Sequence, residues 1–466
     1  MKNLTRLLAI KIALLFFVSP AGAETGTALP EAGDTLKLSL DQSIAMALKN
    51  NRDLQIAREK ILESEERLKE SRTSYMPKLT GEANYTRLDM APFFPAAMFG
   101  GFGSPSPGEE EIPKKIVIGS PNNYSLSLNL TQPIFTFGKI LDQCDISELA
   151  RDAAVSDLRA RKNQLVFETV QSYWSLYNAL ELREVAVESA RMLSSQLNDL
   201  ENLYENGLAA RNDMLKTRAL LSESHLGLIQ ANNSIELAQK NLCDMLGLSL
   251  STAVRLTEKP SADPGLSLIN LEMITAEAIN RRPEIAAVEN QLDIAGKQHT
   301  IDRKGYLPDI SFFANLGYNR PDRQYLDEFY TTWTMGVVAR MNIFDWGAAA
   351  HRARQSSSRK KQLELELEKI REAVKLDVAR ALLQLTESEQ SVSASEEALK
   401  HARENYRVAD QKFTEGIINN TELLDAQLIL TRARANHTNS LARYLVARSN
   451  LERATGKLIR SSEKER

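Results

Sequence analysis

Residues 132–138, Gln-Pro-Ile-Phe-Thr-Phe-Gly, mark the junction between two kinds of sequence. The segment before them, Tyr124 to Thr131, alternates apolar and polar side chains as a half-buried strand does. The tract after them, roughly 141–204, contains no proline and predicts one helix of about 90 Å. A similar junction, Asn-Ile-Phe-Asp-Trp-Gly, occupies 342–347 and precedes a second such tract, roughly 349–413. The chain therefore contains two strand-to-helix junctions of one design.

Matched segments around these junctions indicate two tandem structural repeats. Residues 47–54 match residues 278–285, and Tyr-x-Pro occurs at 75–77 and again at 306–308. The offset shortens by about 22 residues after the first strands, because a Pro/Gly-rich loop at 91–115 lengthens the first half. We predict a first repeat over 24–250, a linker over 251–267, a second repeat over 268–456 and a polar C-terminal tail over 457–466.

Each repeat is expected to hold two strands, a long helix, a turn with one glycine and a returning helix. In the first repeat these elements span about 78–88, 122–132, 141–204, 205–211 and 212–247. In the second repeat they span about 309–319, 331–342, 349–413, 414–420 and 421–456. The predicted fold is mainly α with a small β part.

The composition and the first residues indicate an exported protein. The 466 residues carry a formal net charge of −3, which favours neither a basic nucleic-acid surface nor an acidic tail. Lys2 and Arg6 precede an apolar run at 7–18 and small residues at 21–23, so residues 1–23 are expected to be a signal peptide. A retained membrane anchor is the alternative.

The alternating strands place aromatic side chains at their loop-proximal ends. Tyr85, Tyr124, Tyr318 and Trp333 lie on the apolar side of their strands, as in the aromatic girdle of a membrane barrel. A soluble sheet packed on a core is the alternative. Four strands cannot close a barrel in lipid, because the smallest outer-membrane barrels need about 8. Membrane insertion therefore requires several copies of the chain, and three copies give 12 strands.

No set of residues points to catalysis, so the protein is not expected to be an enzyme or to need a cofactor. The five histidines fit no zinc-binding spacing. Cys144 and Cys243 fall at different heights of the predicted hairpin, too far apart for a disulfide.

From about Leu40 to Gly456 the chain resembles the TolC-like outer-membrane efflux proteins. The resemblance rests on Ala-Leu-x-Asn-Asn at 47–51, Arg-Arg-Pro-Glu at 281–284, the two Tyr-x-Pro segments and Gln-Pro-Ile-Phe-x-x-Gly at 132–138.

It implies a homotrimer with a 12-stranded transmembrane β-barrel in outer-membrane lipid, continued by a long periplasmic α-helical barrel. Its partners would be a periplasmic adaptor and an inner-membrane transporter of the RND, ABC or MFS type, with no nucleic acid. The implied function is a passive exit duct for tripartite efflux or type I secretion in a Gram-negative cell envelope. The alternative is a periplasmic coiled-coil adaptor or scaffold without a pore of its own.

The resemblance also implies roles at the two helix turns. Glu422 and Asp425 match acidic ring positions, so three copies would form a candidate cation ring; a helix N-terminal acid pair is the alternative reading. Asp213 matches a closing-bond acid, with Asn212 where the family usually has a threonine.

Two residues near the second turn depart from the family pattern, since Ile418 replaces a gating arginine and Phe413 a tyrosine. Apolar packing of these two residues with Ile417 is therefore expected to close the pore. Gly207, Leu208, Gly416 and Ile417 would form adaptor-docking tips, with helix C-cap contacts as the alternative.

Overall fold

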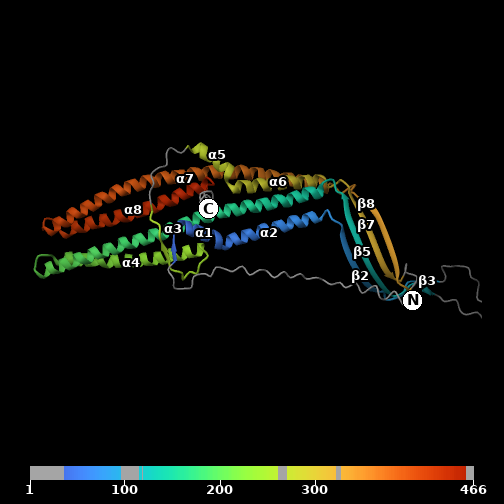
Figure 1. The fold of residues 1–466 in the computed structure, drawn as a ribbon, viewed down its shortest axis with the longest axis horizontal. Helices are drawn as coiled ribbons and strands as arrows, with labels where there is room; N and C mark the ends of the chain where they lie inside the picture. Colours follow the sequence, from blue (N-terminus) through green and yellow to red (C-terminus); the bar gives the residue numbers. More distant parts are fainter. Residues whose placement is uncertain (1–35, 96–114, 118, 261–269, 322–326, 458–466) are drawn as a thin grey trace, which may run out of the picture.

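The computed structural model describes residues 36–95, 115–117, 119–260, 270–321 and 327–457. The molecule is elongated, with a sheet at one end, a shaft of long helices, and two helical turns at the far end (Figure 1). The predicted signal peptide, most of the 91–115 loop, part of the linker and nearly all of the C-terminal tail lie outside the described residues.

The chain is mostly helical with a small sheet, as expected. The helices are α1 (Leu40–Asn50), α2 (Arg52–Thr73), α3 (Lys139–Glu205), α4 (Arg211–Met245), α5 (Leu271–Arg281), α6 (Pro283–Arg303), α7 (Ala348–Thr414) and α8 (Asn420–Ala454). The strands are β1 (Leu36–Leu38), β2 (Lys78–Arg87), β3 (Phe93–Pro95), β4 (Lys115–Val117), β5 (Asn122–Phe135), β6 (Val254–Leu256), β7 (Asp309–Arg320) and β8 (Tyr330–Arg340).

The shaft is a layer of helices in which α3 and α7 run its full length. Each has 67 residues, or about 100 Å at 1.5 Å per residue. Near the sheet the helices lie side by side in the order α2, α3, α6, α7, and toward the turns the order is α4, α3, α8, α7 (Figure 1). The layer therefore has α7 along one edge and α2 followed by α4 along the other.

The helices are held together by narrow apolar seams rather than by one globular core. One cluster, around Leu54, Leu176 and Leu242, packs α1, α2, α3 and α4 together. A second, around Val378 and Tyr444, packs α5, α6, α7 and α8. No helix in the described residues has an apolar stretch long enough to cross a membrane.

The main sheet is antiparallel, with the strand order β2-β5-β7-β8. Its central pair joins β5 of the predicted first repeat to β7 of the predicted second repeat, so the two halves of the chain meet in the middle of the sheet. The outer strands β2 and β8 each pair on one side only in the described chain, which leaves two open sheet edges.

Two short pairings were not expected from the sequence. Strand β6 lies within the predicted linker and pairs in parallel with β1, where Leu38 is buried against the first apolar cluster. Strands β3 and β4 pair at the two ends of the predicted loop. Strands this short carry too few side chains to produce an alternating pattern, so tertiary packing decides them.

Each strand-to-helix junction turns sharply through two left-handed residues. Phe137 and Gly138 have φ angles of 52° and 78°, and Trp346 and Gly347 have 56° and 81°. Glycine adopts positive φ freely, but an aromatic residue rarely does, so the surrounding structure must hold Phe137 and Trp346 in this conformation. This geometry explains why the Ile-Phe-x-x-Gly segments mark the two places where a strand of the sheet passes into a long helix.

Candidate functional sites at the two ends of the molecule

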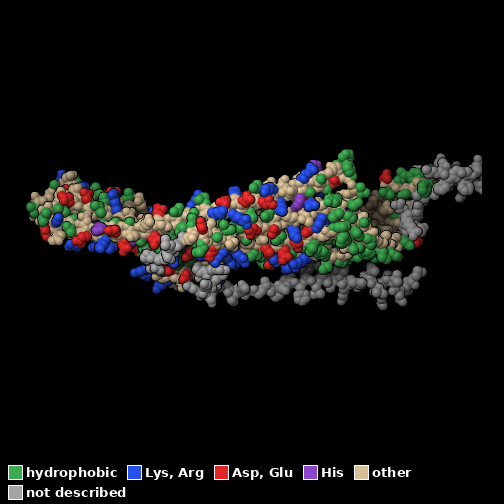
Figure 2. All heavy atoms as spheres, turned by 90° about the horizontal axis from the view of Figure 1, so that it is seen from above, with side chains coloured by type: hydrophobic (Ala, Val, Ile, Leu, Met, Phe, Trp, Pro, Cys, Tyr) green, Lys and Arg blue, Asp and Glu red, His purple; other side chains and the backbone are tan. Residues whose placement is uncertain are grey.

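One face of the sheet is a continuous apolar surface. The register places Leu79 against Leu130, Ala83 against Leu126, and Leu128 against Leu316. The same face continues onto β8 through Trp333, Met335 and Val337, which are 69%, 60% and 63% exposed. Figure 2 shows hydrophobic side chains gathered at this end of the molecule, whereas charged side chains of both signs cover the shaft. A sheet face of this kind needs an apolar partner outside the chain.

The opposite face of the sheet is polar and internally hydrogen-bonded. Ser125 donates to Asn319 at 2.7 Å across β5 and β7, and Asn315 donates to Asn129 two rows nearer the helices on the same face. Asn84 donates to Glu82 at 2.8 Å on β2. This face suits contact with water.

Three of the four predicted girdle aromatics lie close together at the end of the sheet farthest from the helices. Tyr85 faces Tyr124 across β2 and β5, with ring centroids 5.0 Å apart. Tyr318 stacks on Phe329 at 4.8 Å, and Phe329 also contacts Tyr124. Trp333 faces Leu316 and lies one row closer to the helices.

A second group of exposed aromatics, not anticipated from the sequence, lies where the sheet meets the helices. Phe135 contacts Phe137 at 4.6 Å, and Phe344 contacts Trp346 at 5.0 Å. The sequence did contain an indication of this group, because each junction motif carries two aromatic residues two positions apart.

Tyr124 and Phe135 lie about 36 Å apart along β5 at 3.3 Å per residue, and a strand tilt of about 40° reduces this to about 28 Å. That spacing matches the apolar core of a bilayer, about 25–30 Å thick.

The far end of the shaft carries two helical turns of identical geometry. In the α3–α4 turn, Gly207 has φ 73° and donates to Tyr204 O, while Leu208 donates to Leu203 O. Gly416 and Ile417 make the equivalent bonds in the α7–α8 turn. This is the Schellman cap, in which the residue after the glycine often packs back on its own helix. Here Leu208 and Ile417 instead are 76% and 65% exposed.

A buried polar junction joins the two hairpins just above these turns. Asn420 at the start of α8 accepts from Gln196 of α3 at 2.5 Å and donates to Thr217 of α4 at 3.1 Å. Thr217 in turn donates to the backbone oxygen of Asp213. Lys216 donates to Thr421 on the outside of the same contact. The sequence reasoning missed Asn420, Gln196 and Thr217, because a lone amide at a helix start is usually a cap.

The structure places the predicted gate residues around this junction in different roles. Asp213 is half-buried and joins the junction through its backbone, and Asn212 is exposed. Phe413 and Ile418 are both half-buried.

Glu422 and Asp425 share the exposed side of α8. Glu422 also takes part in the helix cap, since its backbone N–H donates to Asn419 Oδ1 and its carboxylate accepts from Asn419 Nδ2, each at 3.0 Å. In the described part of the chain, no group of three or more His, Cys, Asp or Glu side chains is arranged to hold a metal.

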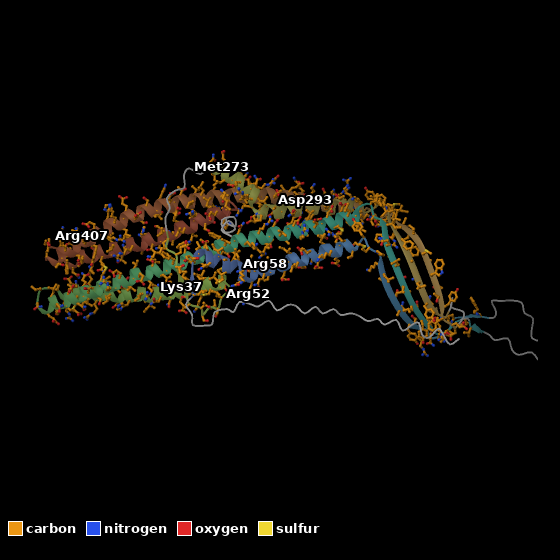
Figure 3. All side chains as sticks on the ribbon, viewed as in Figure 1. Lys37, Arg52, Arg58, Met273, Asp293 and Arg407 are labelled. Carbon is orange, nitrogen blue, oxygen red and sulfur yellow. The ribbon has the colours of Figure 1, made fainter. Side chains whose placement is uncertain are left out.

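Above the turns a small apolar cluster locks α8 between α7 and α3. Leu399, Ala402, Leu430 and Ala433 form it, with Met192 and Tyr406 against it. Burial raises the pKa of the Tyr406 hydroxyl, and nearby carboxylates of Asp410 and Glu188 raise it further. The outer surface here is charged, as at Arg407, which pairs with Glu404 at 2.7 Å (Figure 3).

The apolar face of the sheet lies between two aromatic belts, one formed by Tyr85, Tyr124 and Tyr318 and the other by Phe135, Phe137, Phe344 and Trp346. Such a sheet, carried on a charged helical shaft, defines a class of elongated membrane-embedded channel proteins. The family described as outer membrane efflux protein matches residues 43–248 and 274–457. The chain belongs to this family, and the resemblance to TolC-like proteins is confirmed.

Relatives include the probable efflux pump outer membrane protein TtgC of Pseudomonas putida, 23% identical over 90% of this chain and 83% of that protein. The alkaline protease secretion protein AprF of Pseudomonas aeruginosa is 23% identical over 72% of this chain and 70% of its own length. The Campylobacter jejuni CmeC outer membrane channel has the same fold, with a TM-score of 0.76, 19% identity, and coverage of 91% of this chain and 89% of that one.

The protein is accordingly an outer-membrane exit duct for efflux or secretion, with a periplasmic extension.

Proposed function

We propose that three copies of the chain close into one channel with a 12-stranded β-barrel. The observation that carries this proposal is the four-stranded sheet, apolar on its exposed outer face and open at β2 and β8. An open edge in lipid leaves backbone N–H and C=O groups unsatisfied, so β8 of one copy must pair with β2 of the next. Three copies give 12 strands and an interior wide enough for water, which suits the polar inner face.

The helices of the three copies would continue this barrel as a periplasmic α-barrel. Exposed leucines on the two edges of the helical layer support this arrangement. On α7 they are Leu365, Leu376 and Leu383, and on α4 they are Leu215, Leu226 and Leu237. The two tandem repeats would then make each subunit contribute two similar hairpins, α3–α4 and α7–α8.

The pore would be narrowest at the helix turns. Glu422 and Asp425 from three copies would place six carboxylates around the axis and raise the local concentration of cations. Asp213, Asn212, Phe413 and Ile418 would surround this entrance. The channel needs no catalytic residue or cofactor of its own, because transport through it is passive.

The turns would dock onto a periplasmic adaptor that links the channel to an inner-membrane transporter of the RND, ABC or MFS type. Exposed Leu208 and Ile417 supply the apolar contact at the tips. TtgC is described as part of an efflux pump and AprF as a secretion protein. Similarity to both proteins supports a duct that serves efflux and secretion alike, in which the inner-membrane transporter selects the substrate. If the protein were a soluble adaptor or scaffold, the apolar face of the sheet would be left exposed to water.

Planar-bilayer recording of the purified protein tests the channel directly. We expect cation-selective pores from trimers, and a reduced cation/anion permeability ratio in the E422Q/D425N variant. Glu404→Gln, an exposed acid on the outer surface of α7, is the matched control and should leave selectivity unchanged. Unaltered selectivity in the double variant would reject the proposed carboxylate ring. Absence of any conductance from the wild-type protein would reject the proposed channel.

A further inference from the structure

We propose that the first turns of α7 bind the last turns of α2 from a second copy of this chain, through a charged seam that aligns neighbouring subunits. The proposal rests on the trimeric channel proposed above and adds the contact that guides its closure.

The strand edges already determine which helices would meet. Strand β2 directly follows α2, and β8 directly precedes α7, at opposite edges of the sheet (Figure 1). Along the antiparallel sheet, β2 runs away from the helices and β8 runs toward them, so their pairing between copies would also be antiparallel. Closing the barrel therefore brings α7 of one copy beside α2 of the next.

The start of α7 is basic on the side facing away from its own neighbours. Ala349, Ser356 and Leu367 form its buried face, and at about 3.6 residues per turn Arg354, Lys361 and Leu365 lie opposite. The first turn of α7 contains no acidic residue, although the helix dipole favours acids there. Within the described residues Arg354 makes no ion pair, and Lys361 pairs only with Glu364, at the surface. Helix stability therefore does not account for these cations.

The end of α2 carries the complementary charge on its own outward side. Leu54, Ala57 and Leu68 are buried against the layer. Opposite them lies a stripe of exposed or half-exposed side chains with helical spacing, formed by Ile56, Glu59, Glu63, Glu66 and Glu70. Glu63 pairs with Arg67 and Glu66 with Lys69, but each of these pairs is well exposed and contributes little on its own.

The two stripes match in depth below the sheet. Counted from the helix ends at Ala348 and Thr73, Arg354 and Glu66 both lie about 10 Å down, at 1.5 Å per residue. Lys361 and Glu59 both lie about 20 Å down by the same measure. Leu365 and Ile56, 53% and 55% exposed, then meet about 25 Å down. Two opposite-charge contacts followed by an apolar contact make one continuous seam.

A second copy explains this pattern better than phospholipid headgroups do. Headgroup phosphates would account for Arg354 and Lys361, but not for the glutamates on α2 or for the apolar pair at the same depth. The charge complementarity therefore favours the neighbouring subunit.

Charge reversal followed by charge exchange tests the seam in the full-length protein. We expect R354E/K361E trimers to dissociate in detergent about tenfold faster than wild type, because each of three interfaces exchanges two attractive contacts for repulsive ones. E59K/E66K should have the same effect. The four changes combined should restore dissociation to within about twofold of wild type, since opposite charges again face each other. Arg359→Glu, at the same depth on another side of α7, is the matched control.

The seam is wrong if R354E/K361E trimers dissociate at the wild-type rate, or if the combined variant is no more stable than either pair alone. Loss of bound phosphatidylglycerol in native mass spectra, with trimer stability unchanged, would instead assign the basic face to lipid. Wild-type conductance separates the two proposals. If wild-type trimers conduct but their stability does not respond to the charge changes, only the seam is rejected. If the wild-type protein forms no trimer or no pore, the proposed function is rejected as well.

Discussion

At the scale of single residues, Asn420 is the side chain on which the helix tips depend most. Asn420 is 4% exposed, and its side-chain amide joins α3, α4 and α8 through Gln196 and Thr217. Removing it leaves the buried side-chain N–H of Gln196 without its acceptor, at a cost of about 1–3 kcal/mol, while Thr217 keeps its own bond to Asp213. The two hairpins would then lose the buried hydrogen bonds that Asn420 makes between them.

We therefore expect Asn420→Ala to shift the channel toward separated tips by about fivefold or more, because a loss of 1 kcal/mol already changes an equilibrium that much. Single-channel open probability measures the shift. Asn198→Ala removes an exposed amide of α3 two residues from Gln196 and should have no effect. Equal open probabilities for wild type and Asn420→Ala would show that the junction does not hold the tips.

Sequence reasoning identified where this site lies but not which side chains connect it. Asp213, Glu422 and Asp425 were selected by family register, and the structure places them around the junction. Asn420 could not be recognised, because its partners come from two helices some two hundred residues away in the chain. Only the packing of three helices brings these groups together.

At the scale of elements, we expect the two aromatic belts to bound the part of the molecule that lies in lipid. Trp333 belongs to the sheet and Trp346 to the junction with α7, whereas Trp174 is buried in the shaft. The three tryptophans of the chain thus report on three separate environments.

Single-tryptophan variants in bilayers should show this difference. We expect brominated lipids to quench Trp333 and Trp346 strongly and Trp174 hardly at all, since only the first two contact lipid. Replacing the other two tryptophans with phenylalanine gives each reporter, and Trp174 is the internal control. Equal quenching of all three would contradict the assignment of the sheet to the membrane.

The long elements could be predicted closely, because their patterns extend over many residues. The alternation from Leu79 to Tyr85 indicated a strand, and the proline-free tract before Tyr204 indicated one long helix. The β1–β6 pair could not be found, since Leu36–Leu38 is stabilised by contacts with a distant apolar cluster. The second aromatic belt was missed because its residues fall outside the strictly alternating segments.

At the scale of the whole molecule, the tips lie at the opposite end of a shaft of about 100 Å from the sheet, so one end can be altered without disturbing the other. We expect L208D/I417D to abolish export in cells while trimer yield and bilayer conductance stay normal, because an apolar docking contact is lost. Export assays with trimer quantification measure this. Asn206→Asp, in the same turn, should retain export. Full export by the double variant would exclude docking at the tips.

The pairing of β5 with β7 also has a consequence for how the chain matures. Ser125 and Asn319, hydrogen-bonded neighbours in the sheet, are 194 residues apart in sequence. The α3–α4 and α7–α8 hairpins close over far shorter spans, and non-local pairings form slowly because they must first overcome the entropy of a long loop. The shaft should therefore fold early, in water, and the sheet last. Until the second half has been made, β5 lacks its partner β7, and the β2–β5 pair exposes an unpaired edge and an apolar face, so we expect this stage of folding to be the most prone to aggregation.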